Sequence, residues 1–182
     1  MVSPAHRLTY EDYLRMPEDG HRYEIIDGEL FVSPSPSIRH QVAAMNLCLA
    51  LTQYVRANSL GRVFIAPCAV RLTPDEPVEP DLFFISWERE HIIGEQAVNG
   101  PPDLIVEILS PSGVGRDRFT KFNRYAQVGV AEYWIIDPAS ETIEQYVLEE
   151  GQYVELAPHG DGTQGSRVIP GLRLSVTELF VA

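Results

Sequence analysis

The chain has 182 residues, of which 45% are hydrophobic, and this predicts one globular domain over residues 1–182 and argues against a disordered chain. The longest apolar runs fall short of the roughly 20 residues of a membrane span, and the first residues contain no apolar signal-peptide core. The formal net charge of −12 argues against indiscriminate binding to nucleic acid, but it allows a local basic face or a carboxylate cluster around a divalent cation. Cys48 and Cys68 form no CxxC pair, so we expect reduced thiols in a cytoplasmic protein.

The first third of the chain predicts a helix, a hairpin and a longer helix. "LTYEDYLRMP" has the spacing of a capping box at Thr9 and Asp12 and predicts a short helix. "RYEIIDGELFV" predicts two strands around the turn Asp27-Gly28. A long helix is expected from Ser37 to about Leu60. Its apolar stripe consists of Ile38, Val42, Met45 and Leu49.

The middle of the chain predicts strands at "RVFIA", "AVRLT", "DLFFIS" and "DLIVEIL", followed by a helix over "RDRFTKFNRYAQVG" that ends at Gly129. "EYWIID" predicts the next strand, "TIEQYVL" and "QYVELA" a hairpin, and "VTELF" a short final helix. A helix, four strands, a helix and a further strand pack most naturally as an α/β fold, with a mixed sheet flanked by helices.

Glu107 is unusual because it lies inside the apolar run of "PPDLIVEILS", residues 101–110. An ionised carboxylate in such surroundings costs several kcal/mol unless it lies at a sheet edge, is hydrogen-bonded or binds a cation. Asp103 has the same strand parity, but four residues along a strand span roughly 13 Å, whereas Mg²⁺ and Ca²⁺ ligands lie about 2.0–2.6 Å from the ion. Asp81 begins the neighbouring strand, about 5 Å away, and is therefore the better partner for Glu107.

Two further charged residues have two interpretations each. Glu24, in "YEIID", is either a solvent-facing strand residue or a third member of the acidic site. Lys121 is the only lysine among 14 Lys and Arg residues, and it follows the acidic strand along the chain. It is either part of a solvated helix face or a catalytic residue, because a compact ammonium can position a water molecule and can lose its proton when desolvated.

Other basic residues could contact phosphate, although a charged surface is the simpler interpretation of each. Arg116, Arg118 and Arg124 share the helix region of Lys121. Arg39 and His40 open the long helix, where an anion would be favoured, but a surface histidine is expected at position 40.

Six segments, in this order, resemble the Uma-two family of putative restriction endonucleases, also called domain of unknown function 820. They are "RYEIIDGEL", "SPSIRH", "EPDLFFI", "PPDLIVEILSPS", "RDRFTKFNRYAQVGVAEYWIID" and "TIEQYVL". The family belongs to the PD-(D/E)XK nuclease superfamily, and the resemblance extends from about residue 8 to 155. It implies a restriction-endonuclease-like core with added N-terminal and C-terminal hairpins.

The resemblance also implies roles for individual residues. Asp81 and Glu107 match the metal-binding acids of the superfamily, and the backbone carbonyl of Ile108 is the expected third ligand. The superfamily lysine usually stands two residues after the glutamate, where this chain has Leu109. Lys121 matches a family lysine supplied from the following helix, and Glu24 matches a position often counted in the acidic cluster.

The sequence therefore predicts an endodeoxyribonuclease that uses Mg²⁺, or Mn²⁺, to hydrolyse phosphodiester bonds of DNA, with Asp81, Glu107, Lys121 and Glu24 at its catalytic site. Cleavage of both strands would suit a homodimer. The alternative is a non-catalytic nucleic-acid-binding or assembly module on a nuclease fold, because a fold does not fix a function.

Overall fold

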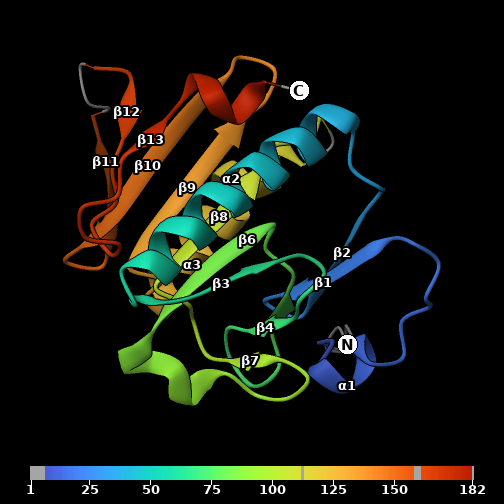
Figure 1. Ribbon diagram of the computed structural model, residues 1–182. Helices are drawn as coiled ribbons and strands as arrows, with labels where there is room; N and C mark the ends of the chain where they lie inside the picture. The colour runs from blue at the N-terminus through green and yellow to red at the C-terminus, as the bar shows by residue number, and fades with distance from the viewer. Residues whose placement is uncertain (1–6, 112, 158–160, 182) are drawn as a thin grey trace.

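The structure, a computed structural model, describes residues 7–111, 113–157 and 161–181. Its centre is a six-stranded sheet in the order β11-β10-β9-β8-β6-β3 (Figure 1). The strands are β3 (Gly61–Ile65), β6 (Leu82–Ser86), β8 (Leu104–Ile108), β9 (Glu132–Asp137), β10 (Thr142–Glu149) and β11 (Gln152–Leu156). β8 and β9 are parallel and the other neighbouring pairs are antiparallel. The predicted mixed sheet is thus confirmed.

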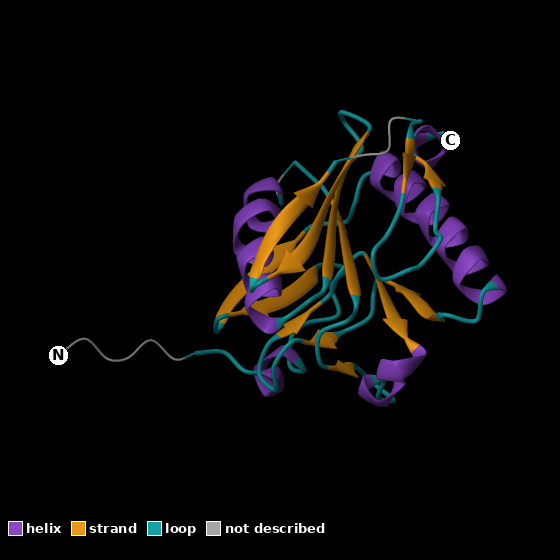
Figure 2. Ribbon diagram, turned by 90° about the vertical axis from the view of Figure 1, so that its left-hand side faces the viewer, coloured by secondary structure: helices purple, strands orange, loops and turns teal. Residues whose placement is uncertain are grey.

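Helices cover both faces of this sheet (Figure 2). The helix α2 (Ile38–Ala57) packs on one face and buries a cluster that includes Leu47 and Leu51 against Leu82 and Val106. The other face is covered by the π-helix η2 (Arg116–Lys121) and the helix α3 (Phe122–Val128), which continue into one another. No helix of the described residues is long and apolar enough to cross a membrane.

The stripe that predicted α2 is not its buried face. Ile38, Met45 and Leu49 are exposed, with Ile38 at 84%, whereas Ala43, Ala44, Leu47, Leu51 and Val55 are buried. The buried face includes two alanines, and such small side chains allow the helix to pack closely on the sheet. Sequence periodicity therefore identified the helix but selected the wrong face.

The remaining elements surround the central sheet. The predicted hairpin is present as β1 (Arg22–Ile26) and β2 (Glu29–Ser33). Asp27 (φ 52°) and Gly28 (φ 80°) both have positive φ, as a two-residue type I′ turn requires. The other short elements are α1 (Tyr10–Tyr13), β4 (Val70–Arg71), β5 (Pro77–Val78), η1 (Trp87–Ile92), β7 (Val98–Asn99), β12 (Thr163–Gln164), β13 (Leu174–Ser175) and η3 (Thr177–Phe180).

Candidate active site

Asp81 and Glu107 lie opposite each other on neighbouring strands. In the antiparallel pair β6–β8, Leu82 is paired with Val106, so the preceding Asp81 is level with Glu107. The N–H of Ile108 donates a hydrogen bond of 2.8 Å to Asp81 Oδ2. Both carboxylates are buried, at 3% and 2% exposure. The two strands therefore bring together the two acids that the sequence paired.

Three protein groups surround the Asp81 carboxylate. His40 Nε2 lies 3.2 Å from Oδ2, which also accepts the Ile108 N–H. Arg22 NH1 lies 2.8 Å from Oδ1 as an ion pair, without the alignment of a hydrogen bond. Burial alone would raise the pKa of Asp81, but the contact with His40 and the charge of Arg22 lower it to about 2. Asp81 is consequently ionised at neutral pH.

Glu107 has the opposite electrostatics. Its Oε1 accepts hydrogen bonds from Lys121 Nζ at 2.8 Å and from Tyr125 Oη at 2.7 Å. Burial raises the pKa of Glu107 to about 8, and the charges of Asp117, Asp81 and Glu24 add to the effect against the opposing charge of Lys121. Without a bound cation, Glu107 thus retains a proton at neutral pH.

Lys121 lies at the centre of the buried charges. Its Nζ is 2.8 Å from Glu24 Oε1 and 2.8 Å from Glu107 Oε1, and the side chain is only 1% exposed. Burial would lower the pKa of Lys121, but the carboxyl groups of Glu107 and Glu24 outweigh it and raise the pKa above its ordinary value. Glu24, whose own pKa is lowered, keeps its negative charge beside the ammonium even while Glu107 holds a proton. The ammonium therefore keeps its proton, and the expectation that Lys121 could lose a proton to act as a base does not fit this environment.

Glu24 is completely buried, so the solvent-facing interpretation of this residue is wrong. β1 positions it, and the N–H of Glu79 donates to its Oε1 at 3.0 Å. The charge of Lys121 lowers the pKa of Glu24 against the effect of burial. Arg116 Nε lies 3.9 Å from Glu24 Oε2 and 3.6 Å from Asp117 Oδ1, so Arg116 extends the same buried charge cluster.

Other candidates from the sequence have different partners. His40 was expected at the surface, but it is buried at 6% exposure. It lies in the first turn of α2, where its N–H donates to the capping Ser37, and its ring contacts Asp81. Arg118 binds Glu144 through two hydrogen bonds, and Arg124 binds Glu76. Asp103 accepts the Ser86 N–H, away from Glu107.

The sequence also contained signals for residues that were missed. Asp117, Lys121 and Tyr125 are spaced four apart, so they share one helix face directed at the acidic site. Arg22 is two residues before Glu24 in a strand, so both side chains project to the same side.

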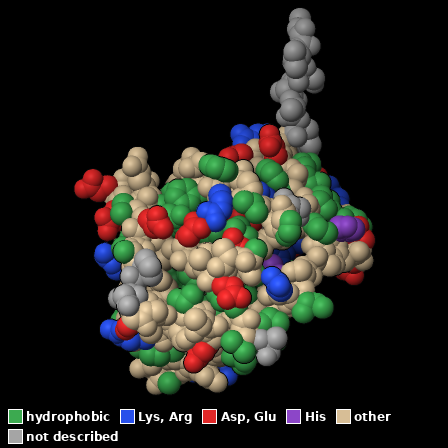
Figure 3. All heavy atoms as spheres, turned by 90° about the horizontal axis from the view of Figure 1, so that it is seen from above, with side chains coloured by type: hydrophobic (Ala, Val, Ile, Leu, Met, Phe, Trp, Pro, Cys, Tyr) green, Lys and Arg blue, Asp and Glu red, His purple; other side chains and the backbone are tan. Residues whose placement is uncertain are grey.

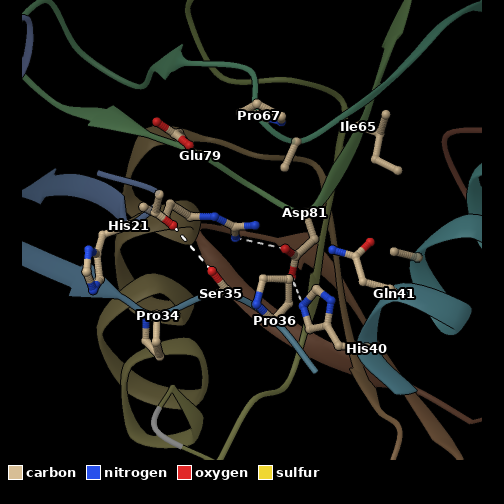
Figure 4. Close-up of a pocket in the computed structure, with 14 residues that line it drawn as sticks. His21, Pro34, Ser35, Pro36, His40, Gln41, Ile65, Pro67, Glu79 and Asp81 are labelled. Atoms are coloured by element: carbon tan, nitrogen blue, oxygen red, sulfur yellow. Dashed lines mark hydrogen bonds and ion pairs between the residues drawn. The ribbon is translucent and has the colours of Figure 1, made fainter. Parts of the chain in front are cut away.

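A cavity of about 310 Å³ opens beside Asp81. Figure 4 shows Asp81 and His40 pointing toward one another, with Glu79, Ile65 and Pro67 also lining the space. Arg22 lines the same cavity. A ligand in this cavity would therefore meet the carboxylates of Asp81 and Glu79 and several hydrogen-bond donors.

Asp81 and Glu107 are the residues that could hold a divalent cation. Among the described residues, no group of three or more His, Cys, Asp or Glu side chains is arranged to bind a metal. The expected ligand set has only two carboxylates and a backbone carbonyl, so it does not need such a group. The donor chemistry fits a hard cation, since both hydrogen bonds to Glu107 use Oε1 and leave Oε2 available.

Comparison with known proteins places the chain in a family. The Uma2 family model, described as "Putative restriction endonuclease", matches residues 10–177. The chain belongs to the Uma2 family. A relative of this chain is the uncharacterized protein sll1609 of Synechocystis sp. (strain ATCC 27184 / PCC 6803 / Kazusa), which is 27% identical over 149 residues, covering 80% of this chain and 84% of the relative.

The fold of this Uma2 protein is similar to a solved structure. A crystal structure of a putative nuclease belonging to DUF820 from Anabaena variabilis ATCC 29413 matches with a TM-score of 0.76. The sequences are 21% identical, and the match covers 95% of this chain and 97% of that one. The likeness supports the restriction-endonuclease-like architecture, and family membership supports a nuclease function.

Proposed function

We propose that this protein is a divalent-metal-dependent endonuclease that hydrolyses phosphodiester bonds of DNA. The observation that carries the proposal is the juxtaposition of Asp81 and Glu107 on adjacent strands, with Lys121 bound to Glu107. Two neighbouring buried carboxylates with strongly different pKa values, of which one, Asp81, lines a cavity, are typical of catalytic sites. Membership in a family of putative restriction endonucleases supports the same reaction class.

In this proposal, Asp81 and Glu107 hold Mg²⁺ or Mn²⁺ together with the backbone carbonyl of Ile108. A bound ion would supply polarisation of the phosphoryl oxygens and would lower the pKa of an attacking water. Tyr125 and Lys121 both donate to Glu107 Oε1, and this orients the carboxylate so that its other oxygen is available. His40 and the Ile108 N–H fix the orientation of Asp81 in the same way.

Lys121 contributes charge and position in this scheme and does not act as a base. Its ammonium holds Glu107 and Glu24 at 2.8 Å each and stays protonated beside them. A fixed positive charge in a buried site stabilises the negative charge that develops on the transferring phosphoryl group, without reorganisation during the reaction. Glu24 is a positioning residue, since it contacts Lys121 and not the expected metal ligands.

Cleavage of supercoiled plasmid with Mg²⁺, Mn²⁺ or EDTA tests the proposal. Wild type should nick or linearise the plasmid only with metal, and Asp81→Asn should be inactive. Asp103→Asn is the matched control, because Asp103 carries the same carboxyl group near the start of β8 but binds the Ser86 N–H. Cleavage that persists in Asp81→Asn would point to a contaminating nuclease.

The alternative of a non-catalytic nucleic-acid-binding module has support in the protein groups that contact both oxygens of Asp81 in the absence of a metal: His40, the Ile108 N–H and Arg22. DNA binding without cleavage under any metal condition would favour it. Figure 3 shows acidic side chains spread over one face of the molecule with Lys and Arg side chains between them, so any DNA contact would be local. The proposal also includes a cytoplasmic homodimer. Each chain would contribute one domain, and the two domains would cleave the two DNA strands.

A further inference from the structure

We propose that Arg22 is the resident cation of Asp81, that a divalent ion displaces it, and that the released guanidinium then binds a phosphate of the substrate. The inference rests on the proposed function and adds to it a residue that contacts the phosphodiester. It also gives the cavity beside Asp81 a ligand class, a nucleic-acid phosphate. Four features of the structure carry it.

The first feature is how the two oxygens of Asp81 are used. Oδ2 is held from two sides, by His40 at 3.2 Å and by the Ile108 N–H at 2.8 Å. Oδ1 has no hydrogen bond among the described residues and faces only Arg22, at 2.8 Å. A cation that binds Asp81 without breaking the two Oδ2 contacts must therefore take Oδ1, and the guanidinium occupies that position.

The second feature is the difference between Arg22 and other arginines near the site. Arg118 and Arg124 are each bound to a glutamate outside the predicted metal ligands, and Arg116 lies between two carboxylates of the buried cluster. The carboxylate partner of Arg22 is Asp81, a predicted metal ligand. Binding of a metal would consequently leave Arg22 without its partner while the other three keep theirs.

The third feature is that Arg22 has space to move. Its side chain is 22% exposed, whereas the side chain of Asp81 is 4% exposed, and both residues line the cavity of about 310 Å³. The residue begins β1, so its backbone is fixed by the hairpin while the long side chain extends into the cavity. A rotation of the side chain can therefore carry the guanidinium away from Asp81 without changes to the fold.

The fourth feature is chemical. A guanidinium presents five N–H donors in a planar fork, and its geometry matches two oxygens of one phosphate. The closest contact of Arg22 with Asp81 is made by NH1. Once a divalent ion holds Asp81, a phosphate that contacts the ion would lie beside the released fork. Metal and substrate would thus be bound by an exchange of partners in which no charged group stays unpaired.

The first test measures metal binding without reference to activity. Mn²⁺ is titrated by calorimetry into wild type, Arg22→Met and Arg124→Met. Methionine keeps an apolar stem and removes the charge, and Arg124 is the matched control because its half-buried guanidinium also pairs with a buried carboxylate, that of Glu76. Loss of the competing cation should lower the Kd of Arg22→Met about tenfold, equivalent to ~1.4 kcal/mol. Arg124→Met should keep the wild-type Kd.

The second test measures phosphate binding with a short fluorescein-labelled DNA duplex by anisotropy, over a range of salt concentrations. At saturating Ca²⁺, with intact DNA verified on gels, Arg22→Met should bind more weakly, and its salt slope should fall by about 1 for one lost phosphate contact. Without divalent ions, wild type and variant should bind alike, because Arg22 is then held by Asp81. The dependence of the difference on metal separates this role from a general loss of charge.

The outcomes distinguish the inference from the proposed function. Equal Mn²⁺ affinity in wild type and Arg22→Met would overturn the role of Arg22 and leave the metal site intact. Mn²⁺ binding only by Arg22→Met would mean that the ion cannot displace Arg22 in the wild type, and it would overturn the proposed exchange. Absence of binding in both would overturn the metal site and the inference together. If Arg22→Met does not fold in melting experiments, Arg22→Lys replaces it: Mn²⁺ affinity should stay near wild type while DNA binding at saturating Ca²⁺ weakens, and unchanged DNA binding would overturn the inference.

Discussion

Replacement of Glu107 by Gln should stabilise the metal-free protein at neutral pH. The pKa of Glu107 is raised from its ordinary 4.5 to about 8, so the folded protein binds this proton more tightly than the unfolded chain does. The stability associated with the proton is fully present below pH 4.5 and is lost as the pH rises through about 8. Glutamine stays neutral at every pH and avoids this loss.

The size of the effect follows from the two pKa values. Each pH unit between them corresponds to about 1.36 kcal/mol. Keeping Glu107 protonated in the folded state therefore lowers the free energy of unfolding of wild type by about 3 kcal/mol at pH 7 but by only about 1 kcal/mol at pH 5. The free energy of unfolding of Glu107→Gln, measured relative to wild type, should thus increase by about 2–3 kcal/mol over the two pH units from pH 5 to pH 7, which is roughly 4–12 °C in Tm for a chain of this length.

Chemical and thermal unfolding at several pH values, in EDTA, provide the assay. Glu132→Gln is the matched control, because Glu132 is a buried glutamate on the neighbouring strand but accepts hydrogen bonds from Trp134, Gln145, Ser166 and two backbone N–H groups. An amide cannot accept them all, so this variant should lose stability. A relative stability of Glu107→Gln that is the same at pH 5 and pH 7 would refute the assignment of a retained proton.

Wild type and Glu107→Gln also test whether Glu107 is a metal ligand. Mn²⁺ at about 100 times its Kd should stabilise wild type by about 2.7 kcal/mol, because it binds only the folded state. The increase in Tm should be much smaller in Glu107→Gln. Equal increases in both proteins would contradict a ligand role for this residue.

Three further predictions concern the same buried cluster. Lys121→Ala should abolish cleavage while metal and DNA binding persist. Lys121→Arg should also be unable to cleave DNA, since a guanidinium cannot reproduce a compact ammonium 2.8 Å from two carboxylates. Near wild-type single-turnover rates in Lys121→Arg would exclude this role of the ammonium. Tyr125→Phe removes a hydrogen bond of 2.7 Å to Glu107 and should weaken Mn²⁺ binding roughly tenfold, whereas Tyr153→Phe, which removes a bond to a backbone carbonyl, should not. Mn²⁺ binding at pH 7 should release about one proton from Glu107, measured by calorimetry in buffers of different ionisation enthalpy; no release, or proton uptake, would contradict the raised pKa.

The local pattern of the sequence determined much of this architecture. Asp27-Gly28 predicts the hairpin because few other dipeptides adopt two successive positive φ angles without strain. An apolar run that follows Asp81 and another that contains Glu107 predict adjacent strands, and the fixed spacing between strands makes these two residues neighbours. Such features depend on backbone geometry and on residues close together in the chain, so they can be recognised without the fold.

Only the tertiary structure decided which groups surround the two acids. His40, on a helix, is 41 residues before Asp81 in the sequence, and Arg22, on a hairpin, is 59 residues before it. Both nevertheless contact Asp81. The same packing buries the alanine face of α2 and leaves Ile38 exposed, although both faces have helical periodicity. The sequence supplied the charged residues, but the burial and distances that set the pKa values of Asp81, Glu107 and Lys121 arise from contacts between distant segments.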